Sequence, residues 1–108
     1  MEEEKNKCSE IARYILYLLS LQPYITMYWG IEDIETFMDS VEFRVDGSLF
    51  KGNVRITFIT GADLFQVSLY DEEGSTSKRI DDIYTDELVE TVDSVIENEN
   101  NVNYLKAV

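Results

Sequence analysis

The sequence contains no histidine, one cysteine and one proline, and only 9 of its 108 residues are lysine or arginine. Without histidine the chain cannot build a His-based triad, an imidazole general base near neutral pH or an imidazole metal site. Its one cysteine, Cys8, can form neither an internal disulfide nor a CxxC site, and we expect it to be a small core residue. An unpaired cysteine without a basic signal segment predicts a cytoplasmic protein.

Acidic residues outnumber basic ones by 22 to 9, which gives a formal net charge of −13. Because each phosphate contact needs a cation, this balance argues against direct binding to nucleic acid and disfavours anionic membrane surfaces. The apolar run at 14–19 is far shorter than the ~20 residues that cross a bilayer. A hydrophobic fraction of 44% is sufficient for one folded domain, which we assign to residues 1–108.

Two helices are predicted in the first 39 residues. In 3–21, apolar residues recur at near-helical spacing. Pro23 disfavours helical geometry at the residue before it, so we expect a boundary there, and 23–30 is compatible with a loop or a short helical turn. A second helix is predicted at 31–39, because four apolar residues share one side: Ile31, Ile34, Phe37 and Met38.

The hydrophobic pattern then changes to period 2, which is typical of a half-buried strand. Apolar and polar residues alternate in 41–45, 54–60 and 64–70, and a weak fourth strand is predicted around 78–83. Turn residues separate these segments, beginning with Asp46-Gly47. Strands with one apolar face each predict an antiparallel sheet that is covered on one side.

The last element is a predicted helix at 86–98, with Thr85 as its N-cap and a polar, frayed tail at 98–108. The order of elements predicts an α+β fold. In it, a three- to four-stranded antiparallel meander carries the N-terminal helices and one C-terminal helix on one face.

The last helix also carries the most specific charge pattern. Four acids spaced i, i+4, i+7 and i+11 project from one side of it: Asp86, Glu90, Asp93 and Glu97. Residues 71–99 hold 11 acidic and 2 basic residues, and Asp81 and Asp82 extend the acidic run upstream of the helix. The pattern is compatible with a solvated, solubilising face or with a surface that docks on a basic partner.

The sequence offers little for catalysis or for a cofactor. The acidic runs at 71–73 and 81–82 lack the spacing of an EF-hand, and 51–53 lacks the glycines of a phosphate-binding loop. The carboxylates are predicted to lie on exposed faces, where nothing sets a pair of them in the contrasting environments that acid–base catalysis needs. We therefore expect no metal, no cofactor and no enzymatic activity.

The aromatic segment Tyr24, Tyr28 and Trp29 has two interpretations. Tyrosine and tryptophan are enriched at binding hot spots, and the same residues also close the end of a small core. The apolar breadth of the first helix likewise suits either deep burial or a homodimer seam.

Several short runs between 41 and 97 resemble small acidic proteins carried by gut-bacterial phages and mobile elements. These runs are VDGSLFKG at 45–52, GADLF at 61–65, DIY at 82–84 and DELV at 86–89. The resemblance brings no catalytic residues. It implies a role in host interaction or defence, because such elements carry many small acidic inhibitors of nucleases.

Together these observations predict a non-enzymatic acidic protein. We expect a stoichiometric inhibitor or adaptor that docks on a basic nucleic-acid-handling protein or a toxin. Its partner-binding residues would be six carboxylates and the aromatic segment: Asp81, Asp82, Asp86, Glu90, Asp93, Glu97, Tyr24, Tyr28 and Trp29. The alternative is a structural module that self-assembles, as a homodimer formed through the first helix and the aromatic segment.

Overall fold

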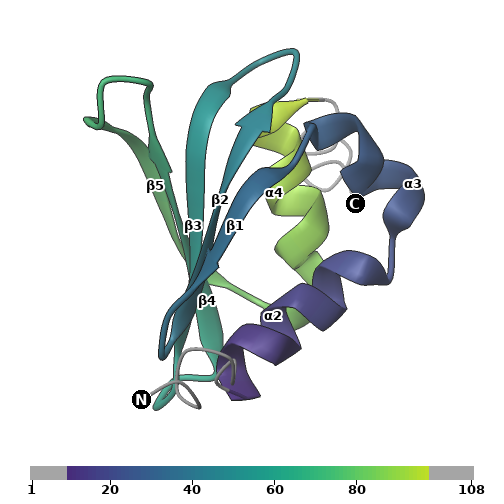
Figure 1. Ribbon diagram of the computed structural model, residues 1–108. Coiled ribbons are helices and arrows are strands. Elements are labelled where there is room, and N and C mark those ends of the chain that lie inside the picture. Colours follow the sequence, from purple (N-terminus) through teal and green to yellow (C-terminus); the bar gives the residue numbers. More distant parts are fainter. Residues whose placement is uncertain (1–9, 98–108) are drawn as a thin grey trace, which may run out of the picture.

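In the computed structural model, which describes residues 10–97, helices cover one face of a five-stranded antiparallel sheet (Figure 1). Three helical elements come first: α2 (Glu10–Ser20), α3 (Pro23–Thr26) and the 3-10 turn η1 (Met27–Trp29). The strands are β1 (Glu32–Thr36), β2 (Ser40–Asp46), β3 (Lys51–Ile59), β4 (Leu64–Tyr70) and β5 (Thr76–Ile83). A second 3-10 turn, η2 (Thr85–Glu87), leads into α4 (Leu88–Ile96). The predicted α+β class is confirmed.

The sheet is a simple meander in which each strand pairs with the next along the chain, in the order β1-β2-β3-β4-β5. Val41, Ile56 and Val67 are register partners on the three middle strands, and all three side chains are completely buried. Their neighbours in sequence point to the opposite face, as the period-2 pattern predicts. The three strong strands expected from the sequence are therefore present.

The sheet has five strands because two segments join it at the edges. The weak strand expected around 78–83 is β5, which pairs with β4. The helix predicted at 31–39 is wrong, since β1 occupies 32–36.

The physical reason for this error is a β-bulge. The register between β1 and β2 shifts between Glu32 and Glu35, so these two residues, three apart, both pair with outward-facing residues of β2. A bulge inserts one residue into the alternation, and the resulting spacing imitates a helical period.

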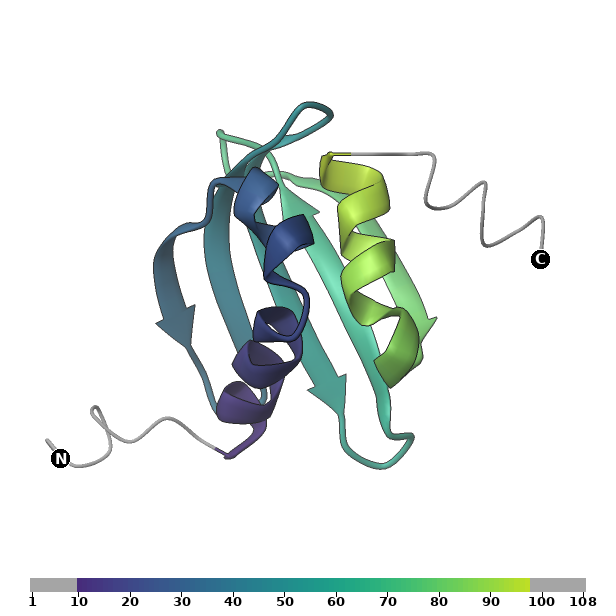
Figure 2. The same cartoon turned by 90° about the vertical axis from the view of Figure 1, so that its right-hand side faces the viewer.

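The helices form a single layer on one side of the sheet, and α4 runs beside α2 and α3 (Figure 2). The predicted packing on one face is confirmed. The ambiguous stretch 23–30 is helical through α3 and η1. Residues 3–9 of the first predicted helix, including Cys8, lie outside the described residues, as does the predicted tail at 98–108.

The last helix begins differently from the prediction. Thr85 is not its N-cap: it lies inside η2, and neither η2 nor α4 has a side-chain hydrogen bond at its cap. The 3-10 turn tightens the first turn of the helix, and the backbone N–H of Glu87 donates to Tyr84 O at 2.9 Å. No helix within residues 10–97 has the length and apolar character needed to cross a membrane.

Candidate interaction surface

The predicted acidic stripe of the last helix is divided by the fold. Asp93 is only 5% exposed, because it faces the helical layer instead of the solvent. Its Oδ1 accepts a hydrogen bond of 2.8 Å from the indole Nε1 of Trp29. Burial raises the pKa of Asp93 above its ordinary value of 3.8, the bond from Trp29 opposes the rise, and the nearby Glu97 charge adds to it. Asp93 is a structural residue, and a partner cannot reach it in this conformation.

Glu97 is also engaged within the protein. Its carboxylate accepts hydrogen bonds from the backbone N–H of Ser48 at 2.8 Å and from the Ser48 hydroxyl at 2.7 Å. The backbone N–H of Leu49 donates to Ile96 O at 2.7 Å. These bonds hold the end of α4 against the turn between β2 and β3. The close approach also explains the glycine in that turn, since a Cβ on Gly47 would overlap Ile96.

The remaining acids lie along one connection. We define the acidic segment as the five carboxylates of residues 81–90, which run from the end of β5 through η2 to the first turn of α4: Asp81, Asp82, Asp86, Glu87 and Glu90. Four of them are exposed and Glu90 is half-buried. Of these five carboxylates, only Asp81 has an ion-pair partner within residues 10–97, which is Arg79 at 3.1 Å.

A bulge shapes the start of the acidic segment. The register between β4 and β5 shifts between Phe65 and Val67, and Asp82 adopts a left-handed backbone conformation with φ of 58°. Aspartate tolerates this conformation better than most residues, because its short side chain can hydrogen-bond locally. The shift ends the regular alternation of β5 just before the chain leaves the sheet.

The aromatic segment is divided as well. Trp29 is completely buried and stacks on Phe43, with ring centroids 6.3 Å apart and an angle of 13° between the rings. It belongs to the core and is withdrawn from the set of partner-binding residues. Tyr24 and Tyr28 are 66% and 64% exposed. The core interpretation is confirmed for Trp29, and the interface interpretation stays a prediction for Tyr24 and Tyr28.

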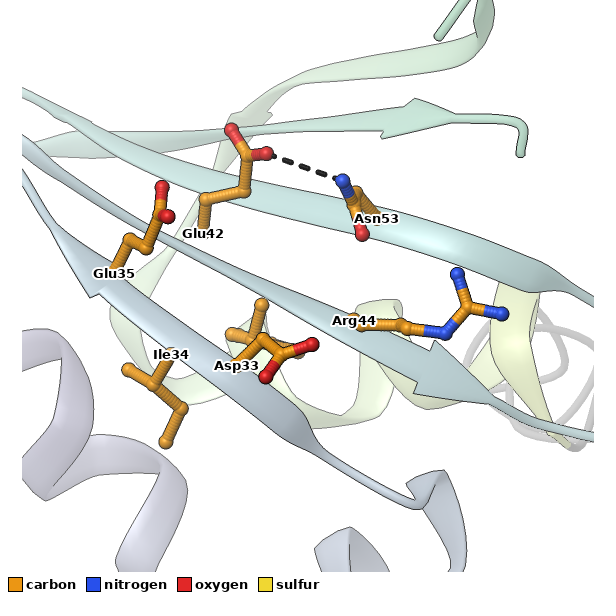
Figure 3. Close-up of a pocket in the computed structure, with 7 residues that line it drawn as sticks. Asp33, Ile34, Glu35, Glu42, Arg44 and Asn53 are labelled. Atoms are coloured by element: carbon orange, nitrogen blue, oxygen red, sulfur yellow. Dashed lines mark hydrogen bonds between the residues drawn. The ribbon is translucent and has the colours of Figure 1, made fainter. Parts of the chain in front are cut away.

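The open face of the sheet holds a feature that sequence reasoning missed. A shallow pocket of about 590 Å³ lies over β1, β2 and β3, and its lining includes Asp33, Glu35, Glu42, Arg44 and Asn53 (Figure 3). It was missed because 31–39 was predicted as a helix. The only signal in the sequence was the polar alternation of Glu42 and Arg44 in the next strand.

Glu42 and Arg44 of this pocket each have an ion-pair partner, whereas Asp33 and Glu35 have none within residues 10–97. Glu42 accepts a hydrogen bond of 3.3 Å from Asn53 and forms an ion pair of 3.7 Å with Arg55, and Arg44 pairs with Glu72 at 3.4 Å. The guanidinium of Arg55 also lies 4.2 Å from the centre of the Phe37 ring. Within residues 10–97, no group of three or more Cys, Asp or Glu side chains is arranged to hold a metal ion.

Comparisons with known proteins give no relative: no family model, no curated protein and no solved structure matches this chain.

Proposed function

We propose that this protein is a non-catalytic binding protein that docks through its acidic segment on a cationic surface of a protein partner. The observation that carries the proposal is the unpaired charge of that segment. Its ten residues contain five acids and no lysine or arginine, and four of the five acids lack an ion-pair partner within residues 10–97. Exposed carboxylates of this kind keep their full attraction for an external cation.

The net charge of the whole chain supports the same partner class. A charge of −13 accelerates association with a basic protein and repels nucleic acid. A basic protein that grips phosphate offers a cationic groove that spaced carboxylates can occupy in place of the phosphates. The proposed partner is therefore a nuclease, a DNA-binding protein or a toxin. The protein would act on it as a stoichiometric inhibitor or as an adaptor.

The resemblance to acidic proteins of phages and mobile elements agrees with this partner class, and the proposal places the encounter in the cytoplasm. Asp93, Glu97 and Trp29 have no part in it, because their contacts lie within the fold. The ion pair with Arg79 reduces the attraction of Asp81 for a cationic partner. We therefore assign the main role to Asp82, Asp86, Glu87 and Glu90.

The test is a capture experiment with two variants of equal charge. The first variant neutralises the segment with Asp82→Asn, Asp86→Asn, Glu87→Gln and Glu90→Gln. The control removes four charges elsewhere, with Glu32→Gln, Glu35→Gln, Asp39→Asn and Asp63→Asn, all of which are exposed positions. Each protein is used to capture binders from lysate at about 0.05 M and about 0.5 M salt, because screening weakens exposed charge pairs.

We expect a basic partner that the wild type and the control retain and the segment variant loses. With the purified partner, the association rate should fall at least about tenfold in the segment variant and at high salt. A partner that both variants lose equally would show that only the overall charge matters. A partner that both retain would make the segment a solvated face, and either result contradicts the proposal.

A further inference from the structure

The helical layer contains the longest uncharged stretch of the chain. Residues 14–31 include no Asp, Glu, Lys or Arg, in a protein with a net charge of −13. One side of this stretch packs into the core through Ile15, Leu18, Leu19 and Trp29. An uncharged stretch needs no further explanation where it is buried, so the informative side is the one that faces the solvent.

That side exposes large apolar and aromatic residues. We define the neutral face as the five side chains of this stretch that are between 53% and 69% exposed: Tyr17, Leu21, Tyr24, Met27 and Tyr28. They come from α2, η1 and the residues between them, which follow one another along the outer layer (Figure 2). All five are exposed to solvent, whereas Ile15, Leu18, Leu19 and Trp29 of the same stretch are buried.

We propose that the neutral face is the contact between two copies of this chain. At roughly 200 Å² for each large side chain, exposures of 53% to 69% amount to about 600 Å² per copy, against ~800 Å² per partner in a standard interface. Patches of this size on a monomer commonly mark interaction sites. Tyrosine and methionine are also enriched in interface cores, where charged residues are depleted.

The charge distribution of the chain favours a second copy of it as the partner of the neutral face. Two chains of −13 repel each other, so they can associate only where neither presents charge at the contact. A two-fold contact places the same surface on both copies, and a face without charge presents no like charges to its own copy. A charged partner, by contrast, finds no complement on this face.

The sheet edges do not offer a second way to associate. Both edge strands carry a register shift, and in each an aspartate has a left-handed backbone: Asp33 in β1 with φ of 54° and Asp82 in β5 with φ of 58°. Bulges and charged residues on edge strands block pairing with a strand of another molecule. Strand pairing at the edges is therefore disfavoured, and self-association needs a contact between faces.

The experiment is sedimentation equilibrium of the full chain from about 1 to about 200 µM, at about 0.05 M and about 0.5 M salt. We expect a monomer–dimer equilibrium that tightens at high salt, because screening relieves the repulsion between like charges. This dependence is opposite to that of the proposed docking on a basic partner. The variant with a neutralised acidic segment should dimerise at least as well as the wild type, so the two proposals can fail separately.

Two variants locate the contact. Tyr24→Ser with Tyr28→Ser should raise the dimer dissociation constant at least about tenfold. The control, Met38→Ser with Leu49→Ser, removes two apolar side chains outside the face that are 81% and 51% exposed, and it should leave the constant unchanged. Tyr24→Lys should weaken the dimer although it reduces the net negative charge of the chain by one, which separates burial of the face from overall repulsion.

Circular dichroism and thermal unfolding confirm that each variant is folded. A wild-type chain that stays monomeric at the highest concentration overturns the proposal, and loss of a captured protein in the Tyr24 and Tyr28 variant would then assign the face to a different partner. A dimer that these substitutions leave intact, or that the control weakens equally, overturns it as well.

Discussion

The hydrogen bond between Trp29 and Asp93 allows a quantitative test of the structure. It joins η1 to α4 across 64 residues of sequence, with both side chains buried. Asp93→Ala removes the acceptor and leaves the indole N–H of Trp29 unpaired in the core. Leaving a buried donor unsatisfied costs about 1–3 kcal/mol, so we expect at least that loss in the free energy of unfolding. The midpoint of thermal unfolding should fall by about 4–8 °C for each kcal/mol.

Asp93→Asn separates the bond from the charge. The amide oxygen can still accept from Trp29, and the buried charge is gone. Because burial raises the pKa of Asp93 above 3.8, the folded chain binds this proton at higher pH than the unfolded chain does. The contribution of Asp93 to stability therefore decreases as the pH rises from about 3.8 to the raised pKa, and the loss is complete above it.

Asparagine resembles the protonated acid, so Asp93→Asn should be at least as stable as the wild type at pH 7. The advantage should shrink as the pH falls through that interval. Only the difference between the two proteins is informative, because the other carboxylates titrate in both.

The assay is urea unfolding at several pH values, followed by fluorescence and by circular dichroism. Trp29 is the only tryptophan and is completely buried, so its emission reports the loss of the core directly. If Asp93→Ala were as stable as the wild type, the buried hydrogen bond would contribute nothing to stability and the prediction would be wrong. An Asp93→Asn variant as unstable as Asp93→Ala would also contradict it, because the acceptor would then be irrelevant.

Two further predictions concern the backbone. Gly47→Ala should destabilise the protein by about 1–3 kcal/mol, since its Cβ would overlap Ile96, whereas Gly61→Ala meets nothing within 4 Å and should be nearly neutral. Urea midpoints of the two variants decide this, and equal midpoints would contradict the packing of α4. Asp82→Val should cost about 1–2 kcal/mol because a β-branched residue is strained at φ of 58°, while Asp82→Gly should keep wild-type stability. If valine were tolerated as well as glycine, the left-handed conformation would be wrong.

The middle of the fold could be predicted from the sequence because its signals are local. Alternation in 41–45, 54–60 and 64–70 places one apolar row on each strand, and short turns between such strands favour a meander. The helix at 31–39 could not be corrected in the same way. The spacing that suggested it arises from a bulge, which exists only because β1 pairs with β2.

The acidic segment could be predicted only in part. Spacing predicted one acidic stripe of Asp86, Glu90, Asp93 and Glu97, but Asp86 lies in η2 before α4 and Asp93 is buried. The spacing could not show that Asp93 and Glu97, at the C-terminal end of α4, contact η1 and the turn between β2 and β3. Which acids stay available to a partner depends on those distant contacts.

The net charge, the lack of histidine, the α+β class and the three middle strands follow from composition and from the local hydrophobic pattern. The burial of Trp29 and Asp93, the bonds of Glu97 to the turn between β2 and β3, and the exposure of Tyr24 and Tyr28 depend on contacts between distant segments. The burial of a polar side chain is set by whether the fold brings it a partner. That partner here lies up to 64 residues away along the chain, where no local pattern can indicate it.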